Sequence, residues 1–101
     1  MGRGYVAIVS IDLHLPTSDS LKAKRGDVRS LKADLQHRFG AAVAEVDHHE
    51  LRQRALITAA LVDRRSSDLG GRLADVERFV LARHETARLD VIGPVKPEEL
   101  E

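Results

Sequence analysis

Apolar side chains alternate with mixed ones along the segment "YVAIVSIDLHL", which runs from Tyr5 to Leu15. A period of two residues, with several β-branched side chains, predicts a strand with one clearly apolar face. Pro16 closes this strand, and the "TSDS" after it supplies several side chains that can cap the start of a helix. The first element is therefore expected to be a half-buried strand that leads into a helix.

The next segment repeats apolar side chains every three to four residues, which is typical of one face of a helix. This stripe consists of Leu21, Val28, Leu31, Leu35 and Phe39. Gly40 is a suitable C-cap, whereas Gly26 inside the segment costs about 1 kcal/mol relative to Ala. We expect the helix to end near Gly40.

The remaining sequence predicts three more strands and a second helix. The expected strands cover residues 41–47, 54–63 and 87–93, and the buried stripe of the helix is Leu69, Leu73, Val76 and Val80. The middle strand is apolar on both faces, as a central strand is. Ser66 or Ser67 is expected to cap the helix, and Gly93 with Pro94 is expected to end the last strand.

The expected order of elements is therefore β-α-β-β-α-β. Two right-handed crossovers around a central hairpin give a ferredoxin-like α+β sandwich, with an antiparallel sheet in the order 4-1-3-2 and both helices on one face. A chain of 101 residues fits one domain with one core, and two separate smaller sheets would need a longer chain. We expect a single domain over residues 1–93 and an acidic, frayed tail over residues 94–101.

The charge balance limits the classes of function. Lys and Arg together number 16, as do Asp and Glu, which excludes the globally basic chain of a general nucleic-acid binder. Any attraction to phosphate must be local. The aromatic side chains are Tyr5, Phe39 and Phe79, and a helix would bury two of them, so stacking on single-stranded bases has little support.

Several kinds of chemistry lack their usual motifs. The absence of cysteine excludes a disulfide, a thiol nucleophile and a thiolate metal site. The sequence has no P-loop, no dinucleotide-binding glycine pattern and no G-x-S-x-G motif. We therefore expect no cofactor and no enzymatic activity. Because the sequence shows neither a membrane-span-length apolar run nor a signal-peptide pattern, we expect a cytoplasmic location and no membrane partner.

The expected topology brings separated polar segments to one end of the molecule. These segments are His14, "SLKAKR", "DHHELRQR" and "RHETAR", and together we call them the rim. The segment "SLKAKRGDVRSLK" carries five bases, of which Lys22, Arg25, Arg29 and Lys32 share one stripe beside the apolar stripe of the helix. This stripe is either a phosphate-binding surface or a solvent-exposed part of the helix surface without a ligand.

Lys24 differs from the other four bases because the helical periodicity places it on the side of the helix that faces the core. It must bend toward the rim or pair with another residue there. The sequence leaves both alternatives open.

Four histidines of the rim, His14, His48, His49 and His84, offer a possible metal site, since imidazole suits zinc, iron or nickel. Adjacent histidines in a hairpin need a third ligand, and an exposed polar turn is the favoured interpretation of "DHHE". His14 and Asp12 could also form an orienting pair on the same strand face.

The sheet face away from the helices is expected to carry a mixed surface. Its apolar members include Val6, Ile8, Leu56, Val62 and Ile92. A second copy of the chain or another partner is expected to cover such a patch, although scattered apolar exposure is also common.

Residues 14–55 resemble the YlxP-like family of small bacterial proteins, a domain of unknown function. The matching positions are Ser20, Leu21, Lys22, Lys24 and Arg25, followed by Glu45, Gln53 and Arg54. The resemblance implies a ferredoxin-like fold. It also implies a role in ribosome assembly or another RNA-linked step, because the family's genes commonly lie among translation and ribosome-maturation genes.

Two departures from the family pattern lie in the hairpin. Arg52 occupies a position where family members often have an aromatic residue, usually Trp. The exchange weakens base stacking and adds a possible phosphate contact. His48 and His49 are not part of the family pattern, which weakens the metal hypothesis.

Three functions remain open. The favoured one is a non-enzymatic module that binds ribosomal RNA or a ribosomal subunit through Lys22, Lys24, Arg25, Arg29, Arg52 and Arg54. The alternative is a homodimeric protein-interaction module that works through the open sheet face, with the rim bases solvated or paired with Glu45, Asp47 and Glu50. The least favoured is a metal-dependent enzyme that uses the four rim histidines.

Overall fold

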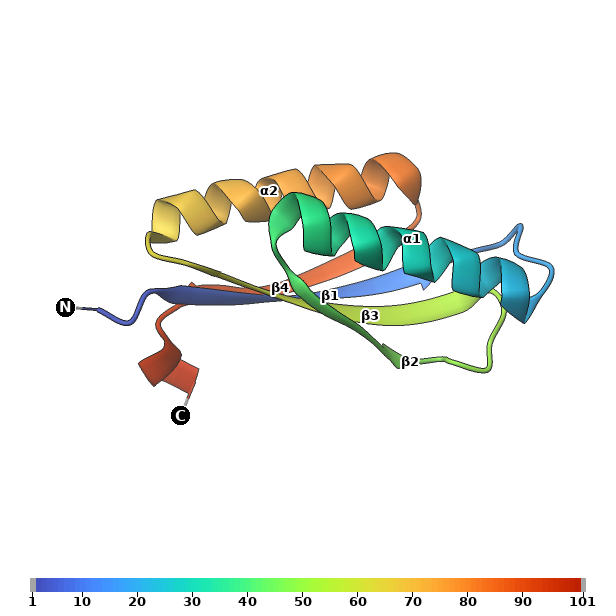
Figure 1. The fold of residues 1–101 in the computed structure, drawn as a ribbon, viewed down its shortest axis with the longest axis horizontal. Coiled ribbons are helices and arrows are strands. Elements are labelled where there is room, and N and C mark those ends of the chain that lie inside the picture. Colours follow the sequence, from blue (N-terminus) through green and yellow to red (C-terminus); the bar gives the residue numbers. More distant parts are fainter. Residues whose placement is uncertain (1, 101) are drawn as a thin grey trace.

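The computed structural model describes residues 2–100 as one two-layer sandwich (Figure 1). The elements are β1 (Tyr5–His14), α1 (Leu21–Phe39), β2 (Ala42–Asp47), β3 (Arg54–Asp63), α2 (Ser66–Arg83), β4 (Arg88–Val95) and the 3₁₀-helix η1 (Pro97–Leu100). The sheet has the order β2-β3-β1-β4, every neighbouring pair is antiparallel, and both helices lie on one face. The predicted ferredoxin-like fold is confirmed.

The core lies between the helices and one face of the sheet. Alternate residues of the two central strands are fully buried there, namely Ala7, Val9, Ile11 and Leu13 of β1 and Ala55, Ile57, Ala59 and Leu61 of β3. The helices contribute Val28, Leu31, Leu35, Leu69, Val76 and Val80. Because a strand has a period of two and a helix a period near 3.6, the sequence pattern alone identified these faces.

The two helices begin in different ways. Ser20 caps α1, as its position suggested, since its hydroxyl oxygen accepts the N–H of Ala23 at 3.0 Å. The expected Ser66 or Ser67 cap of α2 is wrong, because the N-cap residue is Arg65 and no side chain caps the helix. The Asp63 carboxylate, just before this helix, accepts the N–H groups of Arg64 at 2.7 Å and Arg65 at 3.4 Å. The chain therefore turns one residue earlier than the serines indicate.

The last strand also ends later than predicted. It continues past Gly93 to Val95, which pairs with Val6 across a register shift in β1. Gly93 has φ +102°, and a Cβ atom there would lie 2.6 Å from the carbonyl oxygen of Val6. Glycine here therefore permits a close approach of two strands rather than ending one. Residues 97–100 form η1, where a frayed tail was expected.

The side chain of Arg72 joins three elements at one end of the sandwich. Its guanidinium group donates to the carbonyl oxygen of Val62 at 2.8 Å, to the Asp63 carboxylate at 3.3 Å and to the carbonyl oxygen of Phe39. These contacts hold the last residue of α1 and the end of β3 against α2.

Candidate anion-binding site

The segments of the predicted rim do lie at one end of the molecule. The end of β1, the start of α1 and the β2–β3 turn meet there (Figure 1). The N–H of Leu15 donates to the carbonyl oxygen of Gln53 at 2.8 Å, and Lys24 reaches the turn at His48 and His49. The topology therefore places the bases of α1 beside the hairpin, as the sequence indicated.

Lys24 is buried and fully engaged inside the protein. Its relative exposure is 1%, and its Nζ atom lies 3.1 Å from Glu45 Oε2. The same ammonium group donates to the carbonyl oxygens of His48 at 2.5 Å and His49 at 3.3 Å. Of the two alternatives for Lys24, the structure selects internal pairing. Its inclusion among the phosphate-binding residues is corrected, because its Cα lies on the core side of α1.

Arg54 is also paired, on the other face of the sheet. Its Nη2 atom lies 3.1 and 3.0 Å from the two carboxylate oxygens of Asp12. In the antiparallel pair, Arg54 is opposite His14, and its neighbour Ala55 points into the core. Arg54 therefore faces away from the helices and is not part of the surface formed by α1. This corrects the predicted common site.

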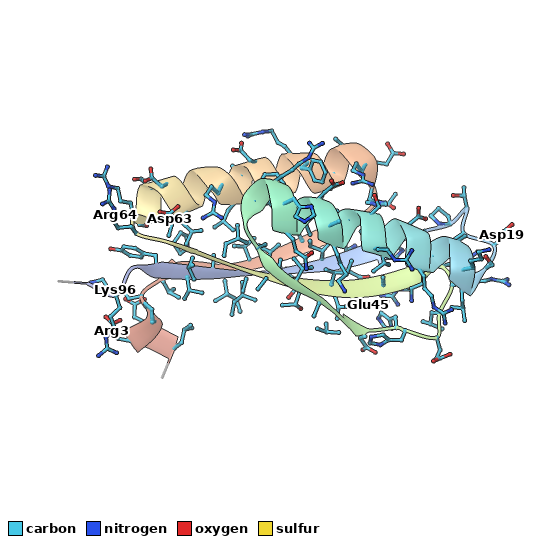
Figure 2. All side chains as sticks on the ribbon, viewed as in Figure 1. Arg3, Asp19, Glu45, Asp63, Arg64 and Lys96 are labelled. Atoms are coloured by element: carbon cyan, nitrogen blue, oxygen red, sulfur yellow. The ribbon has the colours of Figure 1, made fainter. Side chains whose placement is uncertain are left out.

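A groove runs between α1 and β2, and we call it the basic groove. Its volume is about 340 Å³, and its lining includes Arg25, Arg29 and Lys32 from α1 and Glu45 from β2. Figure 2 shows Glu45 on the strand below α1. Within residues 2–100, none of the three bases lies within ion-pair distance of a carboxylate. The one acid in the lining is already neutralised by Lys24, so the groove has an excess of positive charge.

Two further predicted bases lie outside the groove lining. Lys22 and Arg52 are both exposed, and neither has an ion-pair partner among residues 2–100. Lys32, in contrast, lines the groove although the sequence analysis did not place it in the RNA site. Its position in the stripe with Arg25 and Arg29 was the signal that could have identified it.

The four rim histidines lie at two separate places. His48 and His49 lie at the β2–β3 turn, where His49 Nε2 is 3.1 Å from the carbonyl oxygen of Glu45. His14 and His84 line a different hollow of about 280 Å³, together with Asp27. In the part of the chain that the structure describes, no three His, Cys, Asp or Glu side chains are grouped closely enough to hold a metal ion. The geometry gives the metal alternative no support.

His84 has an unusual environment in that second hollow. Burial lowers its pKa, the nearby Arg83 guanidinium lowers it further, and Asp27 partly opposes the change. Its Nε2 atom is buried without a hydrogen-bond partner among residues 2–100. The ring is therefore favoured in its neutral form near pH 7. Arg83 itself donates to the Asp34 carboxylate and, at 2.9 Å, to the Ser30 hydroxyl.

The open sheet face carries the apolar residues that the sequence placed there. Val6 pairs with Val62, and Ile8 pairs with Ile92. Val62 is 68% exposed and Ile92 is 56% exposed, whereas Val6, Ile8 and Leu56 are half-buried. Val6, Ile8, Val62 and Ile92 form one apolar patch, whereas Leu56 lies opposite Asp12, beyond the polar row of Ser10, Thr58 and Asp90. Whether a second copy covers the patch stays a prediction.

Asp63 is the other titratable group with a shifted pKa. Partial burial raises the pKa of its carboxyl group, but hydrogen bonds from the backbone of Arg64 and Arg65 and from Arg72 outweigh this effect and lower it below the ordinary value. The group therefore remains ionised and holds the turn before α2. No helix within residues 2–100 has the length and apolar character of a membrane span.

Comparison with known proteins gives a family but no activity. A search of curated proteins found no match. Among solved structures, the chain is similar to the "De novo designed protein Ferredog-Diesel", with 11% identity, a TM-score of 0.48, and coverage of 92% of this chain and 89% of that chain. A similarity at this level carries no argument about function. A family model described as "Protein of unknown function (DUF503)" matches residues 6–92, which is compatible with the YlxP-like resemblance. The chain belongs to the DUF503 family.

Proposed function

We propose that this protein is a non-enzymatic, cytoplasmic module that binds RNA, in ribosome maturation or translation, through the basic groove. One observation carries the proposal. Arg25, Arg29 and Lys32 line the groove without a carboxylate partner among residues 2–100, while the only acid in the lining is paired with Lys24. Cations that the protein leaves unpaired around a concave surface favour an anionic ligand.

The spacing of these bases suits a chain of phosphates. They occupy positions i, i+4 and i+7 of α1, so they extend over about 10 Å along the helix axis. Guanidinium groups bind two phosphate oxygens in a bidentate geometry. Within residues 2–100, the groove lining contains no aromatic side chain, so recognition would depend on backbone phosphates and RNA shape rather than on stacked bases.

Lys22 and Arg52 would extend the same RNA-binding surface. Lys22 lies one turn before the groove, and Arg52 lies on the turn between β2 and β3. Both are exposed. Since the family resemblance implies an aromatic residue at the position of Arg52, this chain would replace a stacking contact with a phosphate contact.

The test is a binding measurement on ribosomal subunits and on structured ribosomal RNA fragments at two salt concentrations. With three phosphate contacts, affinity should fall about 20- to 40-fold between 50 and 200 mM salt, because each contact releases counterions. The variant Arg25→Glu/Arg29→Glu should abolish binding. The matched control is Arg65→Glu/Arg88→Glu, which makes the same change in net charge at two exposed residues outside the groove.

Equal losses in both double variants would mean that RNA responds only to total charge, and the proposed groove would be wrong. Negligible binding by the wild-type protein would also reject the proposal. Retained binding in the control, with loss in the groove variant, would assign the contact to α1.

A second candidate is a homodimer that forms through the open sheet face. The observation that favours it is the exposure of Val62 and Ile92 on an apolar patch with Val6 and Ile8. Sedimentation of the wild-type protein and of Ile92→Lys at high concentration tests this candidate. A salt-tolerant dimer that the variant converts to a monomer would support it, whereas a wild-type monomer would reject it.

A further inference from the structure

A second basic hollow lies at the end of the molecule opposite the rim. Its volume is about 420 Å³, and Arg3, Tyr5, Arg64, Lys96 and Glu98 contribute to its lining. Figure 2 shows Arg3, Arg64 and Lys96 at one end and Asp19 at the other, along a molecule whose longest extent is 50 Å. We call this the terminal hollow. It is separate from the basic groove in position and in all its residues.

The charges around the terminal hollow are not balanced. Within residues 2–100, Arg3, Arg64 and Lys96 have no carboxylate at ion-pair distance. The nearby Asp63 carboxylate is occupied by Arg72 and by the N–H groups of the turn. Among the described residues, Glu98 is the only carboxylate in the lining. Glu99 lies nearby, where its carboxylate accepts the backbone N–H of Lys96 at 3.3 Å. The three cations still exceed Glu98 and Glu99, which favours an anionic group such as phosphate.

An apolar hollow of about 400 Å³ adjoins the terminal hollow. The two share Arg3, Gly4, Tyr5 and Arg64, and the second is completed by Val62, Asp63 and Pro97. Tyr5 is half-buried and packs against the edge of the core. A ligand that carries a phosphate next to a planar apolar ring would therefore meet matching surfaces on both sides of the same residues.

Gly4 brings the two walls of this site together. It has φ +78°, and a Cβ atom there would lie 2.9 Å from the carbonyl oxygen of Asp63. Only glycine combines this backbone conformation with so close an approach. The approach of the chain before β1 to the end of β3 places Arg3 beside Arg64, although the two residues are far apart in the sequence.

We propose that this end of the protein binds a nucleoside monophosphate, either free or as the phosphorylated end of an RNA strand. Arg3, Arg64 and Lys96 hold the phosphate, and the base lies against Tyr5 and Pro97. The proposal does not depend on the basic groove, because the two sites share no residue.

Amide NMR titrations of the full chain test this site. Adenosine monophosphate should shift the signals of residues 3–5, 63–65, 95, 96 and 98. Adenosine alone and inorganic phosphate alone should each bind about tenfold more weakly, because each lacks one of the two contacts. A short RNA with a 5′-phosphate, compared with the same RNA without it, distinguishes a strand end from a free nucleotide.

Arg64→Ala should weaken adenosine monophosphate binding about tenfold, and Lys96→Ala should weaken it in the same direction. Arg65→Ala is the matched control, since Arg65 is an exposed neighbour that does not line the hollow. Arg25→Glu/Arg29→Glu should leave this binding unchanged even if it abolishes binding to ribosomal RNA. Equal affinity in Arg64→Ala and Arg65→Ala would overturn the proposal, as would phosphate binding as tightly as the nucleotide.

Discussion

Replacing Lys24 with Met removes the ammonium group that joins α1 to β2 and to the β2–β3 turn. The side chains of the ion pair are largely out of water, with 2% exposure for Lys24 and 17% for Glu45. Glu45 Oε2 is buried and has no hydrogen-bond partner among residues 2–100, so the Lys24 ammonium group at 3.1 Å is the charge that compensates it, and the substitution removes that charge. The carbonyl oxygens of the turn at His48 and His49 also lose their donor.

Removing one partner of a buried ion pair costs about 3–5 kcal/mol. The lower end applies here because Glu45 retains some access to water, so we expect a loss of about 3 kcal/mol. A domain of this size has a total stability of about 5–15 kcal/mol. With an m-value of about 1–3 kcal/mol per molar urea, the unfolding midpoint should fall by about 1–3 M.

Urea unfolding followed by circular dichroism measures this change. Lys22→Met is the matched control, because Lys22 is exposed and its substitution should alter stability by less than about 0.5 kcal/mol. Lys24→Met/Glu45→Gln should recover part of the loss, because the double variant also removes the Glu45 charge that Lys24→Met leaves unpaired. If Lys24→Met and Lys22→Met had the same midpoint, the ammonium group of Lys24 would be solvated and the reasoning would be refuted.

Three further changes test the rest of the fold. Ser20→Ala should lower stability by about 1 kcal/mol because the cap of α1 is lost, whereas Ser66→Ala should change it by less than about 0.5 kcal/mol; equal urea midpoints would contradict the assigned caps. Gly26→Ala should raise stability by about 1 kcal/mol, while Gly93→Ala should lower it by about 1–3 kcal/mol because φ is +102°; a stabilising Gly93→Ala in the same assay would exclude the strand approach. The pKa of His84 is lower in the folded protein than in the unfolded chain, so on acidification the unfolded chain binds this proton at a higher pH than the folded protein does. The free energy of unfolding should therefore fall as the pH drops below 6.5. His84→Gln should make the melting temperature less dependent on pH between 7 and 5, and an unchanged dependence would reject the burial of the ring.

The parts of the fold that follow from local periodicity could be predicted from the sequence. The alternation from Tyr5 to Leu15 identified both faces of β1, and the spacing of Leu31 and Leu35 identified the buried side of α1. The order of elements then selected the topology. The end of β4 could not be predicted in this way, because Gly93 serves a contact with Val6 that depends on the fold.

The site was predictable only in part. The bearing of Lys24 indicated a core-side position, but its partner Glu45 depends on how β2 lies beside α1. Arg54 belongs to a rim segment but pairs with Asp12 on the other face of the sheet. The terminal hollow had no local signal, since each of its bases stands on a different segment. The topology brings those segments together, just as it does at the rim.

The contacts at the two ends of α1 have a consequence for how a ligand would bind. Lys24 holds the start of the helix to the β2–β3 turn, and Arg72 holds its last residue to α2 and β3. The wall of the basic groove is thus fixed before any ligand arrives, so no segment has to become ordered on association. A calorimetric titration would then show a small heat-capacity change, unlike the large negative value of a segment that folds as it binds.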